Sequence, residues 1–321
     1  MVKKVIKKIK LEKTKVYSQK LESILKDKKL LGQIVLIDKI RTAILQMMKD
    51  VSFDTEKHIY TRKSDGTWLQ GVSTVSSIIP KDWLSAWGAK EAVKALGFSD
   101  YVGDTELAAE IWEEIKNCKS VEEYQAILKE AKGASRRKSK DALVDGNEGH
   151  AWLEKYVKAK IRDEELPVIP EGTLQRPLTQ FVEWEKESVE YWILSEAMVA
   201  SPEQGYAGTL DGLAMMKTGR LALIDFKFAS HISEDYYLQT AGYENCFEKY
   251  GIMIDDRIIV RLPKTITMDE WDDKERKYRK VENSIEIELV DTIYEEDKNV
   301  FLHMLPVKHW INIQCKKKPV L

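Results

Sequence analysis

Two carboxylates and one ammonium lie inside apolar runs of the segment GTLDGLAMMKTGRLALIDFKF, at positions 208–228. Asp211 is in the first run, and Asp225 and Lys227 are in the second. Paired carboxylates suit a hard divalent cation, because Mg²⁺ and Mn²⁺ prefer oxygen ligands. A lysine beside that cation can contact a phosphate oxygen or neutralise developing charge. These residue types predict metal-dependent cleavage of a phosphodiester bond.

The alternative interpretation is a half-exposed strand whose polar face is charged. The Asp-x-Lys spacing alone is weak, because Glu114, Ile115 and Lys116 repeat it in a chain that is 32% charged. The preceding Gly208-Thr209 and the second carboxylate favour the functional interpretation.

A tight hairpin would position these charges. Lys217-Thr218-Gly219 is a natural three-residue loop, with glycine at the left-handed position. Pairing counted outward from Met216 and Arg220 places Asp211 directly opposite Asp225. Opposed residues have Cβ atoms about 4.5–5.5 Å apart. Asp211, Asp225 and Lys227 then share one face, and the other face is a predicted core face: Leu210, Ala214, Ala222, Ile224, Phe226 and Phe228.

Three further segments supply polar residues that could join this site. His150 lies in a predicted helix after Gly146 and Gly149, and Glu154 is one turn further on. Glu196 is in the middle of the strand-like YWILSEAMVA. Gln239 and Tyr243 are spaced i, i+4 on one helix face. Each has an ordinary alternative: a satisfied histidine, solvated Glu–Lys pairs, an edge-facing charge, or a packing stripe that also contains Tyr236, Phe247 and Tyr250.

Taken as a set, these residues resemble the PD-(D/E)XK nuclease superfamily and its RecB-like branch. His150 is followed by GTLD ending at Asp211, by DFK at 225–227, and by QTAGY at 239–243. Order and spacing match the pattern of that branch over about residues 145–262. Upstream, the segment 58–90 is similar to one in phage exonucleases and in the mitochondrial genome maintenance exonuclease, although Val72-Ser73-Thr74 is a permuted version.

The resemblance implies a fold and a set of roles. The expected fold is an α/β restriction-endonuclease-like core, a central mixed sheet flanked by helices, with an N-terminal helical elaboration. His150, Asp211, Asp225 and the Phe226 carbonyl would bind one or two Mg²⁺ or Mn²⁺ ions, and Lys227 would be catalytic. Gln239 and Tyr243 would position the strand, with Glu196 and Glu154 as supporting candidates. Three scattered cysteines exclude the iron–sulfur cluster of some relatives: Cys118, Cys246 and Cys315.

Composition and charge fit a globular protein with local contacts to a polyanion. The net charge is only −2, but residues 1–30 contain 11 lysines against three acidic residues. SRRKSK at 135–140 and CKKK at 315–318 are also basic, and Arg136, Arg137 and Lys138 could hold phosphates. The ordinary alternative is a solvated charged face. No apolar run approaches the roughly 18 residues of a membrane span, and no signal block is evident, so we expect a cytoplasmic protein without membrane contacts.

Hydrophobic periodicity and turn residues divide the chain. We expect a basic lead and helix at 1–50, a hairpin and helical elaboration at 51–135, and the nuclease core at 136–321. Asp65-Gly66 marks the hairpin turn within 58–73. Predicted helices cover about 31–50, 81–96, two segments within 105–131, 140–160, 173–191, 233–250 with Ser233 as N-cap, and one from about 290. Predicted strands cover 191–200, the two apolar runs, 256–262 and 283–289.

The expected function is a metal-dependent DNA exonuclease for phage DNA processing, recombination or repair, in the host cytoplasm. Its partners would be single-stranded DNA or duplex ends, with a phage recombinase or a single-strand-binding protein. One alternative is an endonuclease or junction resolvase on the same fold, and another is a non-catalytic DNA-binding recombination partner. Trp83 and Trp87, one helical turn apart, could stack unpaired bases or form part of a core stripe.

Overall fold

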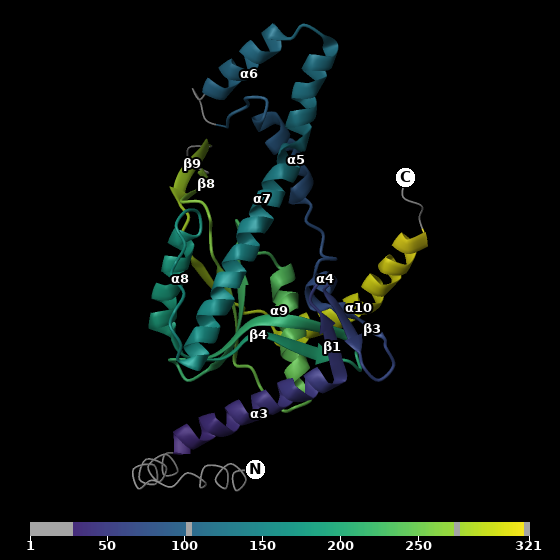
Figure 1. Ribbon diagram of the computed structural model, residues 1–321, viewed down its shortest axis with the longest axis vertical. Helices are drawn as coiled ribbons and strands as arrows, with labels where there is room; N and C mark the ends of the chain where they lie inside the picture. The colour runs from purple at the N-terminus through teal and green to yellow at the C-terminus, as the bar shows by residue number, and fades with distance from the viewer. Residues whose placement is uncertain (1–27, 101–104, 273–276, 318–321) are drawn as a thin grey trace.

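The computed structural model describes residues 28–100, 105–272 and 277–317 (Figure 1). The basic lead at 1–27 and the end of the 315–318 cluster lie outside the described residues. Among the described helices, none has both the length and the apolar character needed to cross a membrane.

An eight-stranded mixed sheet forms the centre of the protein, as expected. Its hydrogen-bonded order is β1-β2-β3-β5-β6-β7-β10, and β4 pairs with β5. The β3–β5 and β6–β7 pairs are parallel, and the other pairs are antiparallel. The strands are β1 (Val51–Asp54), β2 (Ile59–Arg62), β3 (Trp68–Gly71), β4 (Val189–Ser201), β5 (Tyr206–Met216), β6 (Leu221–Lys227), β7 (Asp256–Arg261) and β10 (Glu286–Leu289).

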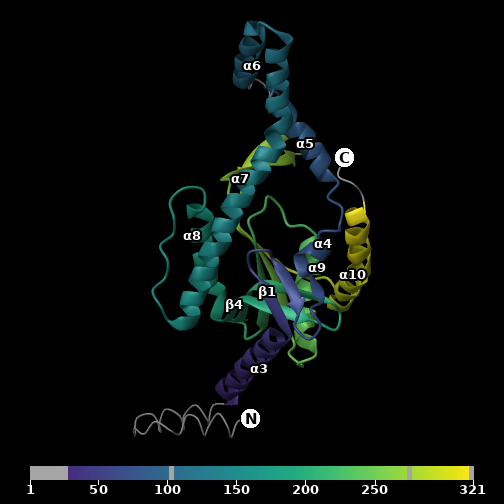
Figure 2. The same ribbon diagram turned by 45° about the vertical axis from the view of Figure 1, so that its right-hand side comes forward.

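Helices cover both faces of this sheet, and each face has its own apolar core (Figures 1 and 2). One core contains residues of α3 (Lys28–Asp50), α4 (Val72–Ser76), α9 (Asp235–Glu248) and α10 (Tyr294–Lys317). The other contains residues of α7 (Val121–Arg162) and α8 (Gln175–Ser188). Alternate residues of β5 and β6 enter different cores, because successive side chains of a strand point to opposite faces.

The hairpin of β5 and β6 has the predicted register. Gly212 pairs with Ile224 and Ala214 pairs with Ala222, and the Met216 amide donates to the Arg220 carbonyl over 2.9 Å. Gly219 has φ +83°, so it provides the left-handed residue of the loop. The predicted core face is confirmed for Ala214, Ala222, Ile224, Phe226 and the half-buried Phe228. Leu210 is the exception, since it packs in the opposite core with Leu213 and Leu223.

The main correction concerns α7. Two predicted helices, one ending near 131 and one at 140–160, are a single helix of 42 residues. Gly133, Gly146 and Gly149 weaken a helix but do not end it. Ser120 caps its start by accepting a hydrogen bond from the Glu123 amide, and Asp163 ends it in a left-handed conformation. The predicted boundary between 135 and 136 therefore lies inside α7.

Other predicted elements lie within a few residues of their expected positions. The β2–β3 hairpin turns at Gly66 (φ +72°) and continues the central sheet through β3 and β5. Ser233 is not the N-cap of α9 as predicted: Glu234 is, and the Ser233 hydroxyl donates to Asp235 Oδ1 over 2.5 Å. An additional hairpin, β8 (Thr267–Asp272) with β9 (Lys277–Glu282), was not predicted.

A thin helical arm extends from the sheet (Figures 1 and 2). It consists of α5 (Trp83–Lys94), α6 (Glu106–Asn117) and the N-terminal part of α7. No residue of α5 or α6 is buried, so the alternative that Trp83 and Trp87 form a core stripe is wrong.

Candidate functional site

Three neighbouring strands bring three carboxylates side by side. Asp211 of β5 is opposite Asp225 of β6 in the register that pairs Gly212 with Ile224. On the other side of β5, Ser195 pairs with Gly212 and Ala197 with Leu210, which places Glu196 of β4 opposite Asp211. This row of Glu196, Asp211 and Asp225 crosses the middle of the sheet.

Asp211 occupies the place where β5 and β6 begin to separate. Its Oδ2 accepts a hydrogen bond from the Phe226 amide over 2.7 Å. The carboxylate thus lies between the two strands, within reach of helices on either face. The predicted contribution of Phe226 was its carbonyl, and its observed contact with Asp211 is through the amide.

Helix α7 brings His150 to this carboxylate. His150 Nδ1 is 3.8 Å from Asp211 Oδ2, and the imidazole is edge-on to Phe228 with ring centroids 5.5 Å apart. Gly149 allows this approach: a Cβ there would lie 2.2 Å from the Phe228 ring. Gly149 therefore reflects a close crossing of α7 over the end of β6, whereas a Cβ at Gly146 would make only an ordinary contact with Phe228.

A buried network surrounds Asp225, whose side chain is 1% exposed. The Lys227 ammonium is 2.7 Å from Asp225 Oδ2 and donates to Gln239 Oε1 over 3.1 Å. Gln239 in turn donates to Asp225 Oδ1 over 3.2 Å and to the Tyr243 hydroxyl over 3.0 Å. The two α9 residues predicted from their i, i+4 spacing thus hold the Asp225–Lys227 pair in place.

Gly208 explains why GTLD begins with a glycine. A Cβ at Gly208 would lie 2.6 Å from Tyr243 Cε1 and 3.0 Å from a Val72 methyl group. Its absence leaves room for the Tyr243 ring of α9 to pack directly against β5. The next residue, Thr209, shares a 2.9 Å hydrogen bond with the Tyr60 hydroxyl of the N-terminal hairpin.

The crowded carboxylates perturb one another. Burial, followed by repulsion from Asp211, raises the pKa of Glu196 to about 8. Burial also raises the pKa of Asp225 to about 7, although Lys227 counteracts it. For Lys227, burial alone would lower the pKa, but the charges of Asp225 and Asp211 outweigh burial and raise it. Three acidic groups with one ammonium make a site whose electrostatics favour an added cation.

The donor atoms present fit a divalent cation. His150, Glu196 and Asp211 each offer a ligand atom, and these atoms lie within 4.8 Å of one another. Two ligands of one Mg²⁺ at about 2.1 Å are at most about 4.2 Å apart, so small side-chain shifts complete such a site. In addition, Asp225 Oδ2 is buried and accepts no hydrogen bond within the described residues; its close contact is the ammonium.

Glu196 is the residue whose importance the sequence understates. It has φ +46°, a left-handed conformation that is rare for a residue with a long side chain and is strained within a strand. A register shift between Trp192 and Leu194 precedes it. Glu154, the other supporting candidate, instead pairs with Lys158 one turn along α7.

The predicted phosphate-binding cluster is not at this site. Arg136 precedes His150 by 14 residues on the continuous α7, about 20 Å along the helix axis. Arg137 pairs with Glu130 over 3.0 Å, and Lys138 pairs with Glu91 of α5 over 2.9 Å. Tyr236, interpreted from the sequence as a packing residue, lies instead beside Lys227, with the ammonium 4.7 Å from its ring centroid.

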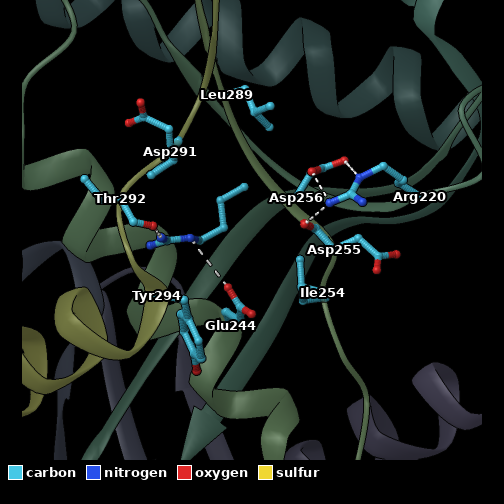
Figure 3. Close-up of a pocket in the computed structure, with 11 residues that line it drawn as sticks. Arg220, Glu244, Ile254, Asp255, Asp256, Leu289, Asp291, Thr292 and Tyr294 are labelled. Atoms are coloured by element: carbon cyan, nitrogen blue, oxygen red, sulfur yellow. Dashed lines mark hydrogen bonds and ion pairs between the residues drawn. The ribbon is translucent and has the colours of Figure 1, made fainter.

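A surface pocket lies at the other end of the same strands (Figure 3). Asp256 of this pocket pairs with Ala222, which lies three residues before Asp225, about 10 Å along β6 from the carboxylate row. Arg220 binds Asp256 there over 2.7 Å, and Arg257 Nε is 3.6 Å from Glu244 Oε2. Both arginines of this pocket are paired with carboxylates, and among the described residues its acidic side chains do not form a second metal-binding cluster.

Glu244 in this pocket is expected to make the stability of the protein depend on pH. Burial raises its pKa to about 7, although Arg257 counteracts it. The folded protein keeps the Glu244 proton up to a higher pH than the unfolded chain does. The contribution of Glu244 to the stability of the fold is therefore greatest below about pH 4.5. It falls by up to about 3 kcal/mol as the pH rises through 7. We expect urea unfolding of the metal-free protein to show this decrease, and Glu244→Gln to flatten it. An unchanged slope in the variant would contradict the assignment.

No protein-family model matches the chain, and no curated protein matches it.

Proposed function

We propose that this protein is a metal-dependent DNA nuclease of the PD-(D/E)XK type that hydrolyses phosphodiester bonds. The observation that carries the proposal is the carboxylate row, with His150 beside Asp211 and the Lys227 ammonium beside Asp225. The combination of possible cation ligands with a fixed ammonium is what phosphodiester cleavage requires.

Each residue has a role in this proposal. His150, Glu196 and Asp211 would hold Mg²⁺ or Mn²⁺, with Asp225 as the further carboxylate that the resemblance assigns. A cation bound there would lower the pKa of a water molecule and polarise a phosphoryl oxygen. Lys227, fixed by Asp225 and Gln239, directs its ammonium at the phosphate and balances the charge that develops. Tyr243 holds the Gln239 amide in position.

The resemblance to phage exonucleases favours attack from DNA ends. We expect the purified protein to degrade linear DNA and to leave covalently closed circles of both single-stranded and duplex DNA intact. We expect EDTA to abolish cleavage and Mn²⁺ to restore it at a lower concentration than Mg²⁺, because an imidazole ligand favours the transition metal. Gel analysis of end-labelled and circular substrates measures both properties. Cleavage of the circles would favour an endonuclease, and cleavage in EDTA would contradict the metal site.

A further inference from the structure

An exposed tryptophan lies beside the candidate site. Trp83, the first residue of α5, is 43% exposed. Part of its indole is therefore open to solvent and free to contact a ligand. Its indole contacts the loop that follows β6, since the ring of His231 is 4.8 Å away at an interplanar angle of 78°. This edge-on packing against His231 holds the indole in place on one side.

A continuous series of contacts joins Trp83 to Lys227. The Lys227 ammonium is 4.7 Å from the ring centroid of Tyr236, and Lys81 Nζ is 5.4 Å from the same ring. Lys81 also pairs with Asp235 over 3.1 Å, and two residues later the chain reaches Trp83. The wall beside the site therefore presents, in order, an ammonium, an aromatic ring, a second ammonium and an exposed indole.

This order matches a single polynucleotide strand. Ammonium groups suit backbone phosphates, and an exposed indole suits the face of an unpaired base. A base inside a duplex is stacked on both faces, so it cannot use such a platform without leaving the helix. The alternative of a protein partner has less support here, because the wall alternates ammonium groups with aromatic rings.

We propose that Trp83, held by His231, is a stacking subsite for one unpaired nucleobase of a single strand, with Lys81 beside the adjacent phosphate. This inference rests on the proposed function and deepens it: the substrate entering the site is single-stranded DNA or the frayed end of a duplex. Trp83 is a positioning residue here and does not contact the reacting atoms.

The test measures binding without cleavage. A labelled single-stranded oligonucleotide is titrated with the full chain in EDTA, and a single abasic position is moved along the strand. In the wild type, one abasic position should weaken binding about 5- to 150-fold. In Trp83→Ala, binding to the intact strand should be weaker by the same factor, and that abasic position should cost nothing further. Trp83→Phe should restore most of the effect.

Matched controls keep the outcome interpretable. Trp112 of α6 is 59% exposed on the arm, so Trp112→Ala removes an exposed indole elsewhere. It should leave the abasic profile unchanged. Identical abasic profiles in wild type and Trp83→Ala, or equal effects of the two alanine variants, overturn the subsite. Cleavage is assayed separately, so the two proposals can fail independently. If the protein cleaves DNA with metal but Trp83→Ala does not change the abasic profile, only the subsite is wrong. If Trp83→Ala changes the abasic profile but the protein does not cleave DNA, the subsite stands and the nuclease proposal is wrong.

Discussion

Asp225→Asn is expected to lower DNA cleavage roughly a thousandfold while leaving DNA binding nearly intact. The substitution keeps the side-chain volume and a carbonyl for Gln239 but removes the negative charge beside Lys227. The ammonium, 16% exposed at its side chain, then loses its charged partner and its fixed direction. Initial rates on linear DNA with saturating Mn²⁺ and anisotropy with the same DNA in EDTA separate the two effects.

Asp256→Asn provides a matched control for this experiment. Asp256 is also an aspartate paired with a cation over 2.7 Å, and it lies at the other end of β6 and β7. We expect its variant to retain normal cleavage. If Asp225→Asn kept full activity, Asp225 would have no part in the proposed chemistry. An equal loss in both variants would show that the effect comes from folding rather than from the site.

The close opposition of Asp211 and Asp225 follows from the sequence because two strong local rules agree. A glycine in the loop sets the turn, and the period of two then assigns the side chains of the hairpin to a face, with Leu210 as the exception. Gln239 and Tyr243 are equally predictable from helical spacing, since α9 is a short, regular helix. The agreement of turn, period and spacing identifies most of this network without a structure.

The position of Glu196 could not be obtained in the same way. A register shift near Ile193 and a left-handed backbone at Glu196 interrupt the period of β4, so alternation no longer gives the direction of its side chains. Similarly, the glycines of α7 resemble helix ends, but tertiary packing around Phe228 keeps the helix continuous. That continuity moves Arg136 away from His150, so the predicted phosphate cluster is separated from the site.

The strain at Glu196 has a functional interpretation when it is compared with the rest of the row. A left-handed residue and a third, partly buried carboxylate both cost stability in a metal-free protein. Among the described residues, the candidate cation ligands cluster at this place alone. Such a cost to stability is expected at a functional position. We therefore infer that Glu196 serves metal binding and not folding.

Glu196→Gln should therefore change stability and metal affinity in opposite directions. Without metal, the neutral amide removes repulsion from Asp211, Glu154 and Asp225, so unfolding at pH 8 should require on the order of 1–2 kcal/mol more. With one anionic ligand lost, Mn²⁺ affinity measured by calorimetry should fall on the order of 10- to 100-fold. Cleavage at limiting Mn²⁺ should decrease with it.

Glu154→Gln is the matched control, because Glu154 is the neighbouring carboxylate that pairs with Lys158 instead of joining the row. We expect it to leave Mn²⁺ affinity unchanged and to alter stability by only a few tenths of a kcal/mol, as for other exposed helix pairs. If Glu154→Gln weakens Mn²⁺ binding and Glu196→Gln does not, the ligand set is assigned to the wrong strand. In that case the strained backbone at Glu196 has a structural role alone, and α7 supplies the metal site through both His150 and Glu154.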